Sequence, residues 1–254
     1  MNIIGICGRS KSGKDTLADM LVSRNQGYVK VAFADPIKRM TAIAYPKITR
    51  EQLWGPSSAR NEPLLSYPRA HGPWVTLADK PGKYCACCSA SDDFYDESVC
   101  YLTTRYALQK LGTEWGRDCY EGTWSALAIE TANKLLNVQG APARGVYHSY
   151  TPWDGLLTQS LPPEVTPRVI LISDVRWPLG NEGKALQAAG GILVSMTRGE
   201  GLVGAAGGHA SETNLDAPPD TFYRVFDNKD WSLAELQAAV NGFHFEYRHV
   251  LQRL

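Results

Sequence analysis

The sequence lacks both a charge imbalance and a long hydrophobic run. Its 254 residues hold 26 basic and 26 acidic side chains, so the formal net charge is zero. A protein that binds nucleic acid through bulk charge carries a basic excess, so this balance argues against that class. No apolar run approaches the roughly 18 residues that span a bilayer, and the N-terminus lacks the basic start of a signal peptide. We therefore expect a cytoplasmic protein with neither a membrane nor a nucleic-acid partner.

Cysteine is also scarce. Six cysteines are too few and too scattered for a disulfide scaffold at this length. Four of them, Cys85, Cys87, Cys88 and Cys100, gather in one segment with His71 upstream. A Cys-x-Cys-Cys cluster is a weaker zinc signal than a paired set of Cys-x-x-Cys motifs. We therefore expect loosely held reduced thiols here, with zinc unlikely on the sequence alone.

Apolar runs alternate along the chain with stretches of helical spacing. Strands are expected at 2–7, 29–33, 169–173, 192–196 and 222–226. Helical or regular patterns occur at 16–22, 37–45, 104–111, 124–135, 182–189 and 232–239. This alternation predicts an α/β fold with helices on both faces of a parallel, roughly five-stranded sheet. The length allows a single domain over residues 1–254.

Two stretches interrupt the alternation. Residues 46–100 are rich in Pro, Gly, Ser and Asp and show no sustained period, and a Gly/Pro-rich connector covers about 140–167. A structureless loop of that length is uncommon in a compact domain and is usually functional. We expect 46–100 to be a loop-rich insertion.

A glycine-rich segment after the first expected strand fits the pattern G-x-x-x-x-G-K. Its residues are Gly8, Arg9, Ser10, Lys11, Ser12, Gly13, Lys14, Asp15 and Thr16. In such a loop the backbone N–H groups point at phosphate oxygens, and the following helix N-terminus adds partial positive charge. Lys14 would reach the β- and γ-phosphates of ATP. The pattern predicts a phosphate-binding loop (P-loop).

Two carboxylates are candidates for holding Mg²⁺. The pattern asks for Ser or Thr after the lysine, and this chain has Asp15. A carboxylate also suits Mg²⁺, so we expect Asp15 to take the metal-facing role. Asp174, at the end of the expected strand 169–173, stands where a second magnesium-holding carboxylate occurs in such folds.

Four arginines, Arg105, Arg117, Arg176 and Arg198, lie at the edges of expected elements. Transfer between two phosphates spreads negative charge over donor and acceptor, and the planar fork of arginine holds phosphate oxygens bidentately. The guanine-specific Asn-Lys-x-Asp motif of GTPases is lacking. In Asp227-Asn228-Lys229-Asp230 its spacing places Trp231 where the last Asp belongs, and we interpret this segment as a turn.

Over about residues 1–45 and 102–239, the order of these motifs resembles the bacteriophage deoxynucleoside monophosphate kinases. The motifs are Gly8–Ala18 with its Gly-Lys-Asp-Thr core, Ala34–Lys38, Leu108–Glu114 with Arg105 before it, Ser173–Arg176, Asn181-Glu182, Thr197–Gly199 and His209–Glu212. The resemblance implies transfer of the γ-phosphoryl group of ATP to a deoxynucleoside monophosphate, with Mg²⁺. It also implies an adenylate kinase-like P-loop fold and allows for a homodimer.

Site residues follow from the resemblance by position. The catalytic group would be Lys14, Asp174, Arg176 and Arg198. The acceptor-binding group would be Asp35, Lys38, Arg105, Gln109, Arg117 and Glu212, and residues 198–215 would form a lid. Two extra residues, Leu179-Gly180, precede Asn181-Glu182, which leaves the role of Glu182 open.

Two other functions remain open. The Gly-Lys-Asp loop is similar to that of phosphomevalonate kinases, so the acceptor could be another phosphorylated small molecule. A non-catalytic nucleotide-binding switch, with the 46–100 segment as its partner-binding face, would bind nucleotide tightly and show no stimulation by any monophosphate.

Overall fold

The computed structural model describes residues 2–9, 12–24, 27–56, 58–72, 74–76, 82–85, 87, 100–136, 146–151, 155–160, 168–198 and 217–251. The chain forms two compact units. The first comprises Met1–Phe33, Gly122–Tyr147 and Gln159–Leu254, and the second comprises Ala34–Glu121 and His148–Thr158.

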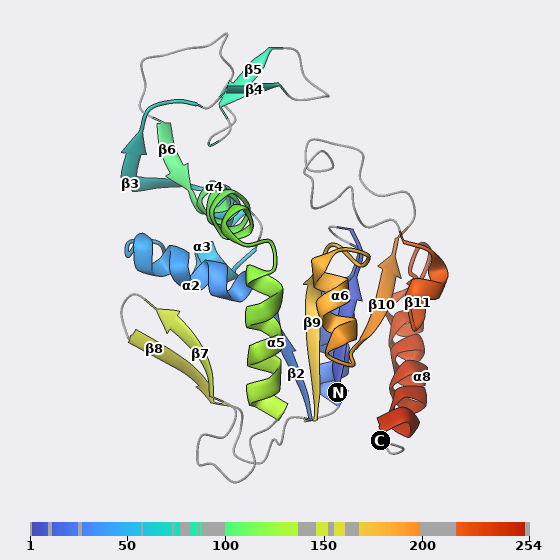
Figure 1. Cartoon of the computed structure of the whole chain (residues 1–254). Helices are drawn as coiled ribbons and strands as arrows, with labels where there is room; N and C mark the ends of the chain where they lie inside the picture. The colour runs from blue at the N-terminus through green and yellow to red at the C-terminus, as the bar shows by residue number, and fades with distance from the viewer. Residues whose placement is uncertain are drawn as a thin grey trace. The chain divides into compact units, whose positions relative to one another are not determined.

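A five-stranded parallel sheet is the centre of the first unit (Figure 1). Its strands are β1 (Ile3–Cys7), β2 (Tyr28–Val31), β9 (Val169–Val175), β10 (Ile192–Thr197) and β11 (Arg224–Asp227). They are arranged in the order β11-β10-β1-β9-β2, and every neighbouring pair is parallel. Strands covered on both faces need continuous apolar sequence, which is why β1 and β9 read as apolar runs. The predicted α/β fold class is confirmed.

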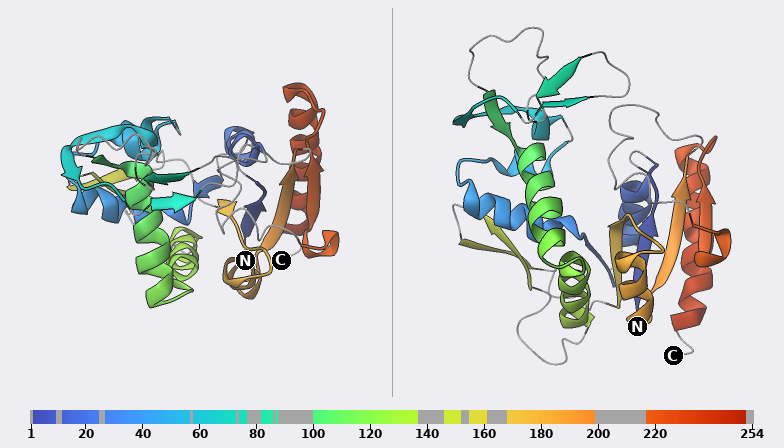
Figure 2. Two further views of the ribbon diagram at one scale, coloured as in Figure 1. Left: turned by 90° about the horizontal axis from the view of Figure 1, so that it is seen from above. Right: turned by 45° about the horizontal axis from the view of Figure 1, so that its top comes forward.

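Helices cover both faces of this sheet. On one face α1 (Lys14–Arg24) and α8 (Leu233–Leu251) pack with Ile4 and Ile6 of β1 in the main core cluster. On the other, Gly5 faces Leu186 of α6 (Asn181–Ala188), and α5 (Thr123–Leu136) packs beside α6. Alternate residues of a strand point to opposite faces, so β1 has one residue set for each helix layer. Figure 2 (left) shows α1 and α6 on opposite sides of the sheet.

Helix α8 is longer than the sequence predicted. It was expected to end near residue 239 but continues to Leu251. Val240, Phe243 and Tyr247 carry its buried stripe onward, with Phe243 and Tyr247 stacked and Phe226 of β11 edge-on to Phe243. A short 3₁₀ turn at Pro219–Thr221 precedes β11.

The second unit is built from short elements. These are α2 (Ala34–Ala44), α3 (Arg50–Trp54), a 3₁₀ turn η1 (Ala59–Asn61), β3 (Pro63–Arg69), β4 (Trp74–Thr76), β5 (Lys83–Cys85), β6 (Cys100–Thr103), α4 (Thr104–Gln109) and a π-helical segment η3 (Lys110–Arg117). Strand β3 pairs antiparallel with β6, and β4 pairs antiparallel with β5. Strands β7 (Val146–Thr151) and β8 (Gly155–Ser160) form a further pair.

The 46–100 segment therefore holds more regular structure than the sequence predicted. Thr49 and Gln52 form a reciprocal capping box that starts α3. Strands β4 and β5 have three residues each, and β3 contains two prolines, so these strands leave no sustained period in the sequence. The connector expected at 140–167 likewise contains β7 and β8. Among the described residues, no helix is both long and apolar enough to cross a membrane.

Candidate active site

The glycine-rich loop lies at the carboxyl end of the central strand β1, and α1 begins at Lys14 directly after it. Gly8 has φ of 148°, and a Cβ on it would lie 2.3 Å from the carbonyl oxygen of Met196. Only glycine permits this approach of the loop to β10. The amide of Ser12 donates to the carbonyl of Arg9 at 3.2 Å, which closes the turn. Ser10 and Lys11 are outside the described residues.

Two polar groups of this loop suit a bound phosphate. The Lys14 Nζ donates to the carbonyl oxygen of Arg9 at 2.6 Å, so its charge is folded over the loop. The hydroxyl of Ser12 is buried and has no hydrogen-bond partner among the described residues. A buried polar atom without a partner is rare in folded proteins, and here it lies within a phosphate-binding sequence.

Asn228 braces the loop from the end of β11. Its side-chain amide donates to the carbonyl of Ser12 at 3.4 Å, and its backbone amide donates to the carbonyl of Thr197 at 2.8 Å. The residue is buried. Sequence reasoning treated Asn228 as part of a turn and missed this role, because only the sheet order brings β11 within reach of the loop.

Asp15 is held in its ionised form at the first turn of α1. Its Oδ1 accepts from the Ser173 hydroxyl at 3.3 Å and lies 2.9 Å from the Lys30 Nζ, which also contacts Asp19. Partial burial opposes ionisation, but the hydrogen bond and charge of Lys30, with smaller contributions from Ser173 and Lys14, lower the pKa of Asp15. The carboxylate is therefore charged at neutral pH.

The register of the sheet places the ends of three strands at one level. Cys7 of β1 aligns with Val175 of β9 and with Ser195 of β10. Ligands of open parallel sheets bind at this carboxyl edge. The glycine-rich loop is therefore flanked by the residues that follow β9 and β10.

Three of the predicted catalytic residues lie at those strand ends. Asp174 is half-buried in β9, and its Oδ1 accepts from the amide of Phe33 at 2.8 Å. Arg176 follows β9 and Arg198 follows β10, and both are exposed. Asp15 and Asp174 both offer carboxylate oxygens, the ligand type that Mg²⁺ prefers. In the structure Asp15 contacts Ser173 and Lys30, whereas Asp174 accepts from the amide of Phe33.

Glu182, whose role the sequence left open, orients the segment that carries Arg176. Its buried Oε2 accepts from the backbone amides of Arg176 at 2.7 Å and Trp177 at 3.2 Å. The pKa of the Cys7 thiol is raised, mainly by burial and to a smaller extent by the negative charge of Glu182. Glu182 is thus a positioning residue beside the loop.

All the residues expected to bind the acceptor except Glu212 belong to the second unit. Asp35 and Lys38 of α2 form an ion pair at 3.7 Å, and Arg105 of α4 donates from Nε to the side chain of Asn61. Gln109 is exposed at the end of α4, and Arg117 is half-buried at the end of η3. Helix α2 packs on η3 where Ile37 meets Gly112. Glu212 and the expected lid beyond residue 198 lie outside the described residues.

A cavity of about 820 Å³ opens in the second unit, and none of the expected acceptor residues lines it. Tyr106 forms part of its wall, with the Arg69 guanidinium 4.6 Å and the Lys110 Nζ 5.4 Å from its ring centre. Burial opposes the charge of Arg69, but the Tyr106 hydroxyl and nearby thiols raise its pKa. Lys110 also pairs with Glu114. Sequence reasoning missed this cavity because β3, α4 and η3 each supply part of it.

One comparison with known proteins gives a match. A family model described as deoxynucleotide monophosphate kinase matches residues 2–64, about a quarter of the chain. The matched part includes the glycine-rich loop and α2. It supports assignment of the chain to that family, which consists of phosphotransferases. A search of curated proteins gave no match.

Proposed function

Starting from the assignment to the deoxynucleotide monophosphate kinase family, we propose that the chain transfers the γ-phosphoryl group of ATP to the 5′-phosphate of a deoxynucleoside monophosphate. The products are ADP and the deoxynucleoside diphosphate. The observation that carries the proposal is the loop after β1. It presents the buried Ser12 hydroxyl, which has no hydrogen-bond partner among the residues that the structure describes, and it lies level with the strand end that carries Asp174 and Arg176.

The loop and the two arginines divide the work of phosphoryl transfer. The loop backbone, Ser12 and Lys14 bind the ATP phosphates, and Lys14 exchanges its contact with the Arg9 carbonyl for a phosphate oxygen. Arg176 and Arg198 neutralise the charge that spreads over the transferred group. Mg²⁺, when held by Asp15 and Asp174, supplies charge neutralisation at the donor phosphates.

The second unit supplies the acceptor side of the proposal. Its residues Asp35, Lys38, Arg105, Gln109 and Arg117 were assigned by position in the sequence, and so was Glu212, which belongs to the sequence range of the first unit. The cavity beside Tyr106 adds a surface suited to a nucleotide, because an aromatic ring stacks on a base and two nearby cations attract a phosphate. Its volume of about 820 Å³ lies in the range of small-ligand sites.

The biological setting is part of the same proposal. An enzyme making deoxynucleoside diphosphates supports DNA precursor synthesis, and from the resemblance to phage kinases we propose that this synthesis occurs in the cytoplasm of an infected cell. A homodimer is the proposed assembly, as in many members of the resembled family.

Transfer of a labelled phosphoryl group tests the reaction. The full chain is incubated with γ-labelled ATP, Mg²⁺ and each of the four deoxynucleoside monophosphates, with ribonucleotides and mevalonate 5-phosphate in parallel. We expect label in at least one deoxynucleoside diphosphate. Label recovered only as inorganic phosphate would contradict the proposal, and label on mevalonate 5-phosphate alone would favour the other kinase.

Substitution of Lys110 tests the acceptor cavity. Lys110→Ala removes one of the two cations beside Tyr106, so we expect the KM for the deoxynucleotide to rise about tenfold, the effect of one charged hydrogen bond, with the KM for ATP unchanged. Lys47→Ala removes an exposed lysine of the same unit that does not line the cavity and serves as the control. Equal KM values in both variants would remove the cavity from the acceptor site.

A further inference from the structure

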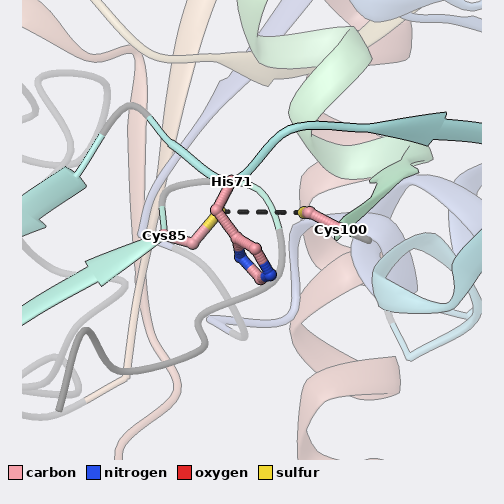
Figure 3. A group of neighbouring side chains, drawn as sticks. All are labelled: His71, Cys85 and Cys100. Atoms are coloured by element: carbon pink, nitrogen blue, oxygen red, sulfur yellow. Dashed lines mark hydrogen bonds between the residues drawn. The ribbon is translucent and has the colours of Figure 1, made fainter. Parts of the chain in front are cut away.

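In the second unit, a histidine and two cysteines that are distant in sequence come together. His71 follows β3, Cys85 ends β5 and Cys100 begins β6. The ligand atoms of these three residues all lie within 4.8 Å of one another. Figure 3 shows the two sulfur atoms facing each other, with the imidazole of His71 beside them. Both thiols are buried, a placement that the sequence did not predict.

The spacing of the two sulfur atoms matches a shared metal ion. Cys85 Sγ and Cys100 Sγ lie 3.8 Å apart. Two thiolates bound tetrahedrally to zinc at about 2.3 Å are separated by about 3.8 Å. A disulfide needs a separation of about 2 Å, so the pair is placed for coordination and not for a direct bond.

The surroundings hold the ligands in place. The backbone amide of Gly72 donates to Cys85 Sγ at 3.3 Å, a contact of the kind that orients metal-bound thiolates. Gly72 has φ of 103°, a conformation that other residues adopt only with strain. The ring of His71 stacks on that of Trp74, with centres 5.8 Å apart and planes inclined by 12°. Cys100 is 2% exposed.

Charge also favours an ion at this position. Two thiolates and one neutral imidazole balance the charge of a divalent zinc ion, so the occupied site would carry no net charge in its buried surroundings. Zinc binding releases one proton from each thiol. Soft thiolate ligands with imidazole select zinc over magnesium or calcium, which prefer oxygen.

We propose that His71, Cys85 and Cys100 bind a structural zinc ion that joins the β3–β6 and β4–β5 strand pairs. Among the described residues, the apolar cluster around this site is small: its buried members are Cys85, Cys87 and Cys100, packed by Trp74 and Tyr106. Segments with little core commonly depend on a metal for their fold. The fourth ligand is a further thiol or a water. Cys87 is one candidate for that thiol, and its Sγ donates to the Tyr101 carbonyl at 2.9 Å.

Zinc content tests the proposal independently of kinase activity. Full-length protein purified without chelator is analysed by mass spectrometry of the metal, and we expect one zinc per chain. Cys85→Ser and Cys100→Ser should lose the zinc, whereas Cys119→Ser, which changes an exposed cysteine of the same unit, should keep it. Wild-type protein without zinc, or equal zinc in all four proteins, would overturn the site.

Cobalt substitution keeps the test decisive if the serine variants fail to fold. Wild-type protein is stripped with chelator and reloaded with Co²⁺. We expect the intense visible bands of tetrahedral cobalt and a sulfur-to-cobalt charge-transfer band whose intensity counts the thiolates. An intensity that corresponds to two thiolates means that the fourth ligand is water. An intensity that corresponds to three means that the fourth ligand is another cysteine, which the Cys87→Ser and Cys88→Ser variants then identify. A cobalt spectrum without a charge-transfer band would contradict cysteine ligation.

Discussion

At the residue scale, the charge of Lys30 sets the ionisation of Asp15. Because the folded pKa of Asp15 lies below its ordinary value of 3.8, the pair stabilises the fold above about pH 4. This contribution is lost as the pH falls through the lowered pKa. The carboxylate therefore remains charged at any pH at which ATP and Mg²⁺ would bind.

Lys30→Met should raise the pKa of Asp15 toward its ordinary value, because burial then acts without the opposing cation. The measurement is an NMR titration of the Asp15 carboxyl carbon. Lys134→Met breaks an exposed ion pair with Glu130 on α5 and should leave the pKa of Asp15 unchanged. An unchanged pKa in Lys30→Met would show that Lys30 does not control this carboxylate.

Asn228 acts on the loop through a single residue. Asn228→Ala removes the donor to the Ser12 carbonyl, so we expect a higher KM for ATP and a loss of stability of about 1 kcal/mol. Asn241→Ala removes a side-chain amide whose oxygen accepts from the side chain of Gln237 on the same helix α8, and it should leave the KM for ATP unchanged. Steady-state kinetics at varied ATP distinguishes the two variants, and equal KM values would contradict the bracing role.

At the scale of elements, helix α5 shows how a pattern can give the right element and a slightly wrong face. Helical spacing favours a face made of Trp124, Leu127, Ala128, Thr131 and Leu135. In the structure Trp124, Ala128 and Leu135 are buried, whereas Leu127 is 39% exposed and Ala132 is fully buried. The buried face of α5 is therefore shifted from Leu127 toward Ala132.

Trp124→Ala should therefore lower the free energy of unfolding by about 3–5 kcal/mol, the usual cost of truncating a buried aromatic residue. Leu127→Ala, on the exposed side of the same helix, should lower it by less than about 1 kcal/mol. Urea unfolding followed by circular dichroism measures both. A larger loss in Leu127→Ala than in Trp124→Ala would mean that the buried face lies where the sequence placed it.

Local patterns predicted the central sheet and the helices around it, but not the short elements of 46–100 or the β7–β8 pair. The parallel sheet followed from apolar runs such as β9, and the position of the glycine-rich loop between β1 and α1 followed from nine consecutive residues. The brace by Asn228, the cavity beside Tyr106 and the meeting of His71 with Cys100 each join distant segments. The local pattern of a single sequence does not show which distant segments meet. The Cys-x-Cys-Cys run was a weak signal for a metal site. It did not show that Cys100, at the start of β6, meets His71.

At the scale of the whole molecule, the two units carry different parts of the proposed reaction. The first has the glycine-rich loop, the carboxylates Asp15 and Asp174, and Arg176. The second has all the acceptor candidates except Glu212, and the His71–Cys85–Cys100 cluster that we propose as a zinc site. The zinc proposal concerns the fold of the second unit, so its outcome leaves the donor site of the first unaffected. The kinase proposal depends on both units.

The most direct measurement of the central claim is the initial rate of ADP formation from ATP and Mg²⁺ with each deoxynucleoside monophosphate. Wild-type protein, Lys14→Ala and the surface control Lys134→Ala are compared. We predict strong stimulation by at least one deoxynucleotide in the wild type and the control, and a fall in kcat of about 10²–10³ in Lys14→Ala, since Lys14 stabilises the transferred charge. A wild-type protein that binds ATP but is stimulated by no deoxynucleoside monophosphate would contradict the account.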